Sequence, residues 1–357
     1  MIQGLLRYLL FLIKSYIQNL NRRRYRMIKF KKLLAIIMAV MLLVLSFSAC
    51  GRNATQDEDN GTAKTGDEEI YIPIISKGFQ HQFWQAVKSG AEKAAKDYNV
   101  KITFEGPETE TMVDKQIDML QTALDKNPDA ICLAALDSKA CAPLLEKAKE
   151  KNIPVVGFDS GVDSDIPVTT AATDNKAAAA LAADKLAEAI GKEGEVGVIV
   201  HDQTSQTGVD RRDGFVNRIK EQYPNIKIVD IQYGDGDQLK STDLAKAMIQ
   251  AHPNIKGFFG ANEGSIIGVL NAVKELNMEG KITVVGYDSG KQQIEAIKAG
   301  TELGAVTQDP IGIGYKAVEA AIKAIKGESL PKTIDTGYHW YDKSNIDSDD
   351  IKPLLYE

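Results

Sequence analysis

From Ile70 onward, short apolar runs alternate with amphipathic segments, and this alternation restricts the fold more than any other feature of the chain. Short apolar runs bounded by turn residues are typical of buried strands, whereas apolar residues spaced three and four apart are typical of helices. In Thr109–Asp125, for example, Val113, Ile117 and Leu120 share one helical face. Strands that alternate with helices predict parallel sheets covered by helices on both faces.

The alternation runs twice along the chain. The first run predicts successive strands and helices at Ile70–Ile75, Gln82–Tyr98, Val100–Phe104, Thr109–Asp125, Ala130–Ala134, Ala140–Lys151, Pro154–Phe158 and Asn175–Ile190. The second run predicts strands at Val196–Val200, Ile226–Tyr233, Gly257–Gly260, Ile282–Tyr287 and Gly304–Thr307, and helices at Asp210–Gln222, Leu239–Ala251, Ser265–Leu276, Lys291–Ala299 and Ile311–Ile325. Two such runs predict an α/β protein of two lobes, each built on a doubly wound parallel sheet.

Polar and aromatic residues gather where the predicted strands end. In open parallel sheets, ligands bind beyond the carboxyl ends of the strands. The segments in that position are Ser76–Trp84, Leu136–Ser138, Asp159–Gly161, His201–Thr207, Ala261–Glu263 and Asp288–Gly290. They are the first candidates for a binding site.

Residues 27–50 have the layout of a secretory signal peptide. Three lysines precede an apolar stretch at 33–45, and small residues follow it. The stretch is short for a membrane span, and an uncleaved transmembrane anchor is the alternative. The sequence FSACG at 47–51 resembles a bacterial lipoprotein cleavage box. This resemblance implies that Cys50 is lipidated and that the body is anchored to the membrane outside the cytoplasm.

The segments on either side of this export signal are unlike a folded domain. Residues 1–26 form a second apolar, Arg-rich segment before another methionine, and our hypothesis is that translation starts at Met27. Residues 51–69 contain no aromatic or large aliphatic side chain. A segment of that composition cannot bury a core, so it predicts a disordered tether.

The remaining composition excludes several classes of function. After position 50 the chain has 34 basic and 49 acidic residues, so the body repels nucleic acid and no nucleic-acid partner is expected. Cys132 and Cys141 are expected to be buried structural thiols, because their spacing resembles no metal site. Phosphate-loop and dinucleotide fingerprints are absent from the sequence. No metal and no other cofactor is expected.

Six short motifs, in a fixed order and spacing, resemble the periplasmic ribose/galactose-type sugar-binding proteins, which are relatives of the ligand-sensing domain of LacI-type repressors. The motifs are IPVVGFD at 153–159, TDN at 173–175, RRDGF at 211–215, GANE at 260–263, VGYD at 285–288 and TQDP at 307–310. The resemblance runs from about Ile70 to the C-terminus. It implies two lobes, with 70–173 and 310–336 in the N-terminal lobe and 174–309 and 337–357 in the C-terminal lobe. Three hinge crossings would join them, near Ala172–Asp174, Gln308–Pro310 and Asp335–Gly337.

The resemblance also implies ligand contacts at individual positions. In the loop after the first strand, the matching residues are Ser76, Phe83 and Trp84, with Gln80 or His81 as a polar contact. In later loops the matching residues are Asp159 with its neighbour Ser160, and Arg211, Asn262, Asp288 and Gln308. Ribose binders carry an arginine where this chain has Ser160 and an asparagine where it has Ala134, which argues against ribose itself.

These residue types suit a sugar. Phe83 and Trp84 offer flat apolar surfaces to its C–H faces, and charged and amide groups offer hydrogen bonds of about 1.5–3 kcal/mol to its hydroxyls. Without the resemblance, the two aromatic residues fit a hydrophobic core equally well, and Asp159 and Asp288 fit helix caps. Asp174, just before an Ala-rich segment, is expected to be such a cap.

The function implied by the resemblance is capture of a sugar by closure of the two lobes, and its delivery to the permease of an ABC importer. A monomer that binds no cofactor is expected. One alternative is a sensor that feeds a chemotaxis or two-component receptor. Another is an exported enzyme acting on sugars, with Asp159 and Asp288 as its carboxylate pair. No nucleophile pairs with His201, and a transcription regulator would need a DNA-binding motif that the sequence lacks.

Overall fold

The computed structural model describes residues 69–356, which form two six-stranded sheets. The predicted export segment 1–50, the lipidated Cys50 and all but the last residue of the tether 51–69 lie outside the described residues. In 69–356, no helix is both long and apolar enough to cross a membrane.

The first sheet is entirely parallel and has the strand order β11-β5-β4-β3-β1-β2. Its strands are β1 (Tyr71–Ile75), β2 (Lys101–Glu105), β3 (Ile131–Leu133), β4 (Val155–Phe158), β5 (Thr169–Ala172) and β11 (Thr333–Asp335). The helices packed on it are α2 (Gln82–Tyr98), α3 (Val113–Asp125), α4 (Ala142–Glu150) and α10 (Pro310–Ile325). We call this unit lobe 1.

The second sheet has the order β12-β10-β9-β8-β6-β7 and is parallel except for its antiparallel edge strand β12. Its strands are β6 (Gly194–Val200), β7 (Ile226–Tyr233), β8 (Ile255–Gly260), β9 (Thr283–Tyr287), β10 (Gly304–Gln308) and β12 (Tyr338–Asp342). Its helices are α5 (Asn175–Ala189), α6 (Gln206–Gln222), α7 (Gln238–Ala251), α8 (Glu263–Glu275) and α9 (Lys291–Ala299), and a short 3₁₀ helix, η1 (Lys352–Leu354), follows. We call this unit lobe 2.

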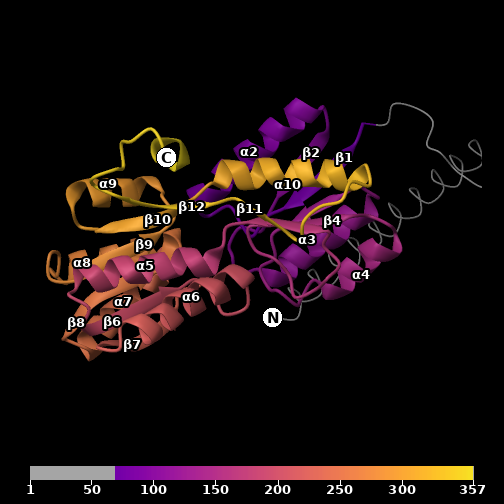
Figure 1. Ribbon diagram of the computed structural model, residues 1–357. Coiled ribbons are helices and arrows are strands. Elements are labelled where there is room, and N and C mark those ends of the chain that lie inside the picture. Colours follow the sequence, from indigo (N-terminus) through magenta and orange to yellow (C-terminus); the bar gives the residue numbers. More distant parts are fainter. Residues whose placement is uncertain (1–68, 357) are drawn as a thin grey trace, which may run out of the picture. The chain divides into compact units, whose positions relative to one another are not determined.

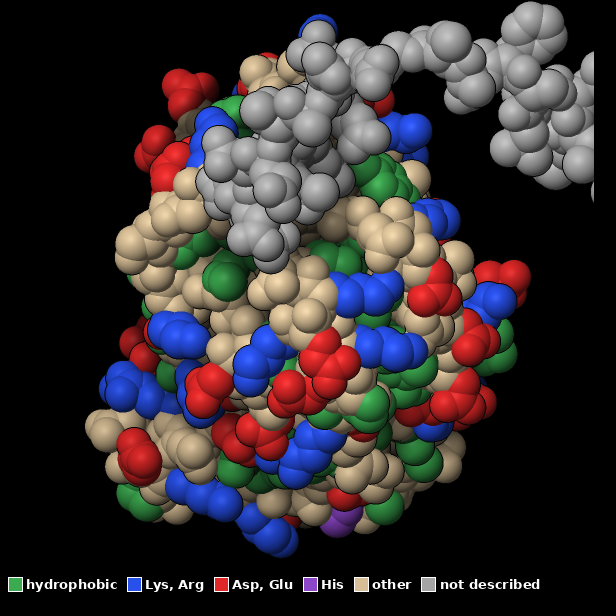
Figure 2. Space-filling model, turned by 90° about the vertical axis from the view of Figure 1, so that its right-hand side faces the viewer, with side chains coloured by type: hydrophobic (Ala, Val, Ile, Leu, Met, Phe, Trp, Pro, Cys, Tyr) green, Lys and Arg blue, Asp and Glu red, His purple; other side chains and the backbone are tan. Residues whose placement is uncertain are grey.

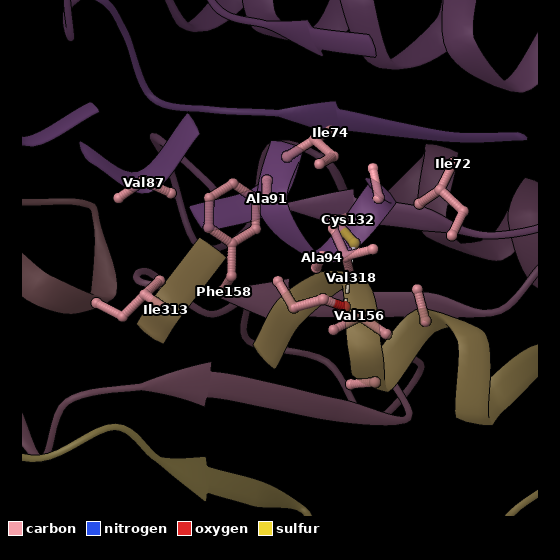
Figure 3. Packing of buried hydrophobic residues seen from close by; sticks show 14 of the residues in the cluster. Ile72, Ile74, Val87, Ala91, Ala94, Cys132, Val156, Phe158, Ile313 and Val318 are labelled. Atoms are coloured by element: carbon pink, nitrogen blue, oxygen red, sulfur yellow. Dashed lines mark hydrogen bonds between the residues drawn. The ribbon is translucent and has the colours of Figure 1, made fainter. Parts of the chain in front are cut away.

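Helix α10 belongs to lobe 1 although it follows the last parallel strand of lobe 2. Figure 1 shows α10 lying beside α2, which precedes it by more than 200 residues. The two helices approach so closely that a side chain on Gly90 would collide with the backbone of Ile311, and one on Gly314 with that of Val87. Beneath them, Val87, Ile313 and Phe158 pack in a continuous apolar core (Figure 3). This packing holds the first turn of α2 in place at the end of the sheet.

The chain passes between the lobes three times, as the predicted fold requires. It leaves β5 through Thr173 and Asp174 into α5, leaves β10 through Asp309 into α10, and leaves β11 through Thr336 and Gly337 into β12. Asp174 caps α5 by accepting the backbone N–H of Ala177 at 3.1 Å, which confirms its predicted role.

Most predicted elements are confirmed to within two residues, and the exceptions are three short strands and the starts of two helices. The sequence pattern misses β5, β11 and β12, which are short or mixed in polarity and owe their place to pairing with a neighbouring strand. Helix α3 begins four residues later than predicted. Helix α6 begins four residues earlier, because the Ser205 hydroxyl caps it by accepting the N–H of Gly208 at 3.1 Å.

Both predicted buried thiols are confirmed. Cys132 and Cys141 are free and buried, and burial raises the pKa of each thiol, to about 11 for Cys141.

On the face shown in Figure 2, Lys and Arg side chains are interspersed with Asp and Glu and do not gather into a basic patch. That face offers no surface typical of nucleic-acid binding.

Candidate ligand-binding site

A small cavity lies where loops of the two lobes meet. Its lining residues come from the carboxyl ends of strands and the first turns of helices in both lobes: Lys77, His81, Phe83, Trp84, Glu110, Asp159, His201, Thr207, Arg211, Asn262, Asp288 and Gln308. Its volume of about 20 Å³ is enough for about one water molecule. A sugar is larger, so the side chains that line the cavity must rearrange when the lobes close on one.

The two aspartates of the cavity sit on nearly identical loops. Val155–Gly161 after β4 reads VVGFDSG, and Val284–Gly290 after β9 reads VVGYDSG. Both aspartates have left-handed backbones, with φ of 54° at Asp159 and 78° at Asp288, a conformation that Asp tolerates better than most residues. Each N–H donates to the neighbouring strand of its own sheet, at 2.9 Å and 2.8 Å respectively. The two sheets therefore present equivalent carboxylates to one cavity.

The carboxylate of Asp288 is fully engaged by lobe 2. Its Oδ1 accepts a hydrogen bond from Gln308 Nε2 at 2.8 Å, and its Oδ2 accepts one from the backbone N–H of Glu263 at 2.9 Å. Arg211 Nη1 lies 3.8 Å from Oδ2 and completes a buried ion pair. Asp288 thus organises this wall of the cavity.

Arg211 is fixed from several sides. Its Nε donates to Asn175 Oδ1 at 2.8 Å, its Nη1 donates to the carbonyl of Ala261 at 3.0 Å, and its guanidinium lies 3.8 Å from the ring centroid of Tyr287. The Tyr287 hydroxyl donates to the same Asn175 oxygen at 2.9 Å. A guanidinium held in this way presents its remaining N–H groups in a set orientation.

Asp159 differs from Asp288 because its carboxylate makes no hydrogen bond to any residue in 69–356. Burial raises its pKa to about 6, against the opposing charges of Lys77 and Arg211. A buried carboxylate without hydrogen bonds is costly. It is therefore the strongest unused acceptor in the cavity.

Lys77 and Glu110 form a charged pair on the lobe 1 side. Lys77 Nζ donates to Thr207 Oγ1 of lobe 2 at 3.3 Å and lies 3.6 Å from Glu110 Oε2. Burial favours the neutral amine, but the charges of Glu110, Asp202 and Asp159 outweigh it and raise the pKa of Lys77. Burial likewise opposes ionisation of Glu110, yet the charge of Lys77 lowers its pKa to about 2. Both groups are charged at neutral pH.

The aromatic residues serve the core and the cavity together. Trp84 is buried, stacks edge-on with Phe83 at 5.0 Å between ring centroids, and donates its Nε1–H to Glu110 Oε1 at 2.8 Å. Phe83 also contacts Tyr356 near the C-terminus, at 6.2 Å between centroids. The two sequence interpretations of these aromatics, core packing and ligand contact, are therefore compatible.

Several polar atoms of the cavity have no partner among residues 69–356. They are His81 Nδ1, His201 Nδ1 and Gln308 Oε1. Burial and the charge of Lys77 lower the pKa of His201 to about 3, so its ring is neutral at pH 7. Buried polar atoms normally have partners, so these atoms favour a polar ligand with several hydroxyl groups.

Of the predicted site residues, eight line the cavity and three do not. His81, Phe83, Trp84, Asp159, Arg211, Asn262, Asp288 and Gln308 line it. Ser76 instead donates to two backbone carbonyls, and Gln80 bridges the lobes, with its Oε1 accepting the N–H of Glu110 and its Nε2 donating to the carbonyl of Gly236. The Ser160 hydroxyl is buried without a partner and lies outside the lining residues.

Four lining residues, Lys77, Glu110, His201 and Thr207, were not predicted as ligand contacts. Lys77, His201 and Thr207 lie in the segments Ser76–Trp84 and His201–Thr207, which the strand-end rule had already marked as candidates. Glu110 lies in the loop before α3, at a position where the sequence predicts the start of a helix. Its position depends on the path of the folded chain, which local sequence does not show.

A larger hollow, of about 740 Å³, lies beside α8 and α9 and includes Gln82, Glu263 and Lys291 in its lining. It holds no aromatic side chain and none of the buried ionic pairs described above. Within residues 69–356 there is also no cluster of His, Cys, Asp and Glu that could hold a metal ion. The smaller cavity between the lobes is therefore the candidate site.

Residues 72–329 match the family described as the periplasmic binding protein domain. The chain belongs to this family. The match spans both lobes and includes every residue that lines the cavity. Membership of a periplasmic binding protein family implies a location outside the cytoplasm.

Known members of the periplasmic binding protein family are similar over most of the chain. The ribose import binding protein of Bacillus subtilis is 28% identical over 85% of this chain and 96% of its own length. The D-allose-binding periplasmic protein of Escherichia coli is 29% identical over 72% of this chain and 86% of its own length. A carbohydrate transporter solute-binding protein from Agrobacterium radiobacter, solved with D-arabinose, is 34% identical with a TM-score of 0.78, over 81% and 100% of the two chains.

Proposed function

We propose that the chain captures an uncharged sugar in the cavity between its lobes and delivers it to an ABC importer. The observation that carries this proposal is the convergence of three carboxylates, a guanidinium, two amides and two aromatic rings from both lobes on one cavity. Flat apolar surfaces beside charged hydrogen-bonding groups suit the two kinds of surface of a sugar. The similar proteins are named for ribose, allose and arabinose.

The charges of the cavity favour an uncharged ligand. Lys77 and Arg211 face the carboxylates of Glu110 and Asp288, so these four charges balance. Asp159 adds negative charge at neutral pH. A phosphorylated or acidic sugar would meet this carboxylate without a free cation to pair with.

Entry and capture require hinged closure. In the structure the lobes touch across the cavity, as in the hydrogen bond from Lys77 to Thr207. The three crossing segments allow the lobes to separate, and a sugar that contacts both lobes stabilises the closed state. We assign 70–173 and 310–336 to one moving lobe and 174–309 and 337–357 to the other. Tyr356 contacts Phe83 of lobe 1 and accepts the N–H of Ser289 of lobe 2, so the C-terminal segment touches both.

Export, anchoring and partner follow from the sequence. We propose that a signal peptide at 27–50 exports the chain and that a lipid on Cys50 anchors it to the outer face of the cell membrane, where a permease can receive the sugar. We propose that the protein is a monomer and binds no nucleic acid or cofactor. Catalysis is not part of the proposal, because both oxygens of Asp288 are already bonded and neither is free to attack a glycosidic bond or activate water.

The test is a binding screen with D-ribose, D-allose and D-arabinose by calorimetry and thermal shift. At least one sugar should bind and raise the melting temperature, since a ligand of the native state stabilises it. Trp84→Ala should abolish high-affinity binding, and chromatography should recover the sugar unchanged. Wild-type affinity in Trp84→Ala would contradict the site, and a converted sugar would indicate an enzyme.

A further inference from the structure

Two helices that face each other across the lobes lack caps of their own. Helices α5, α6, α7, α8 and α10 each begin with a residue whose side chain caps the first turn. The N-cap residues of α2, α3, α4 and α9 supply no side-chain cap. Of these helices, α2 and α9 begin where the two lobes meet. The first N–H groups of a helix need acceptors when they are buried.

Each of these helices receives its cap from the other lobe. Glu263, in the first turn of α8 in lobe 2, accepts the N–H of Gln82 through Oε1 and that of Phe83 through Oε2, both at 3.3 Å. In the opposite direction, the side-chain oxygen of Gln82 in lobe 1 accepts the N–H of Lys291, at the start of α9, at 2.9 Å. The caps are exchanged between the lobes.

The exchange is joined directly to the candidate site. On the lobe 1 side, the first turn of α2 carries the aromatic pair Phe83 and Trp84 of the cavity. On the lobe 2 side, the backbone N–H of Glu263 donates to Asp288 at 2.9 Å. Glu263 is only 4% exposed, so its carboxylate is dehydrated when the lobes are together. Its negative charge lies at the N-terminus of α2, where the helix dipole stabilises it.

We propose that Glu263 and Gln82 form a latch of exchanged helix caps that stabilises the closed state of the two lobes and slows release of the ligand. This inference rests on the hinged closure of the proposed function. In the separated state water would replace both caps, so the latch acts only when the lobes meet. Glu263 is a positioning residue: it holds the helix that carries the aromatic rings against the wall organised by Asp288.

The first test needs no ligand. Away from the latch, the N–H of Ser138 in lobe 1 donates to the carbonyl of Thr204 in lobe 2 at 3.0 Å, so hydrogen exchange at Ser138 reports separation of the lobes. Glu263→Gln keeps the shape of the side chain but replaces one acceptor oxygen with a donor group. In this variant the full chain, purified in detergent, should exchange the Ser138 amide about tenfold faster, which corresponds to about 1.4 kcal/mol. Glu295→Gln, on the exposed side of α9, is the matched control and should leave exchange unchanged.

Faster exchange only at Gln82 and Phe83, with Ser138 unchanged, would mean that Glu263 is a local cap, and the latch would be refuted.

The second test uses whichever of D-ribose, D-allose or D-arabinose binds the wild-type chain most tightly. Glu263→Gln and Gln82→Ala should each raise the dissociation rate about tenfold and leave the association rate nearly unchanged. An unchanged dissociation rate would overturn the latch.

The two proposals fail in different ways. If none of the three sugars binds but Ser138 responds to Glu263→Gln, the latch stands and the sugar proposal fails. If a sugar binds and neither exchange nor dissociation responds, the sugar proposal stands and the latch fails. If Glu263 only supported folding, Glu263→Gln would lower the melting temperature but would not raise the dissociation rate of the sugar relative to its association rate.

Discussion

The loops VVGFDSG in lobe 1 and VVGYDSG in lobe 2 have almost the same sequence and backbone but different surroundings. In lobe 2, Asp288 has three partners, and the Ser289 hydroxyl accepts a hydrogen bond from Thr307 Oγ1 at 2.9 Å and donates to the carbonyl of Leu354 at 3.2 Å. In lobe 1, neither the Asp159 carboxylate nor the Ser160 hydroxyl has a hydrogen bond to any residue in 69–356. The lobe 2 loop is completed by its own lobe, whereas the lobe 1 loop leaves polar groups for a ligand.

The comparison shows why equivalent residues need not have equivalent roles. Phe158 and Tyr287 differ by one hydroxyl, and that hydroxyl, with the ring beneath Arg211, ties the lobe 2 loop to Asn175. Phe158 instead packs against Trp84, at 6.3 Å between ring centroids. The polar environment of lobe 2 pre-organises its carboxylate, while the apolar environment of lobe 1 leaves Asp159 costly to ionise.

The largest expected effect is on the folding stability of Asp288→Asn. Removing this charge leaves Arg211 buried without its carboxylate, which should lower the free energy of unfolding by about 3 kcal/mol. Urea denaturation at pH 7.5 measures the change. A loss below about 0.5 kcal/mol would show that Asp288 is not the organising group of lobe 2.

The opposite sign is expected for Asp159→Asn. The folded-state pKa of Asp159 is about 6, above the ordinary value of 3.8, so its ionisation costs stability as the pH rises through that window. The asparagine variant should therefore be more stable than the wild type by about 2–3 kcal/mol at pH 7.5, and this difference should fall below about 1 kcal/mol at pH 4. Equal stability at both pH values would contradict the cost assigned to Asp159.

The Asp159→Asn variant should also weaken sugar binding by at least about tenfold, since one charge-assisted hydrogen bond is lost.

The smallest expected difference is between the two serines. Ser289→Ala removes a hydroxyl with two hydrogen bonds and should cost about 1 kcal/mol. Ser160→Ala removes a buried hydroxyl without a bond and should leave stability unchanged or slightly higher. Thermal unfolding of the two variants side by side checks this pair, and equal losses would remove the distinction between the loops.

Much of the fold could be predicted from the sequence because the apolar pattern is strong. The bounds of α2, Gln82–Tyr98, and of α9, Lys291–Ala299, agree with the prediction at both ends. The edge strand β12 could not be predicted, because its mixed aromatic and polar residues show no clear period and acquire a strand partner only when the chain returns to lobe 2. The pattern records local packing but not long-range pairing.

The candidate site was partly predictable, because the apolar pattern locates the strand ends where ligands bind. Asp159 and Asp288 stand at strand ends, and the near-repeat of seven residues around them is a sequence signal of equivalent loops. What separates their roles is that Arg211 and Gln308 engage the carboxylate of Asp288, whereas no group in 69–356 donates a hydrogen bond to that of Asp159. Those neighbours come from distant parts of the chain, so only the folded structure distinguishes the two aspartates.

The most direct measurement is a crystal structure of the chain with whichever of D-ribose, D-allose or D-arabinose binds most tightly. The account predicts the sugar in the cavity between the lobes, with a hydroxyl oxygen about 2.5–2.7 Å from the Asp159 carboxylate and the contacts of Asp288 within lobe 2 retained. A sugar bound in the hollow beside α8 and α9, or a sugar in the cavity that leaves Asp159 without a contact, would contradict it.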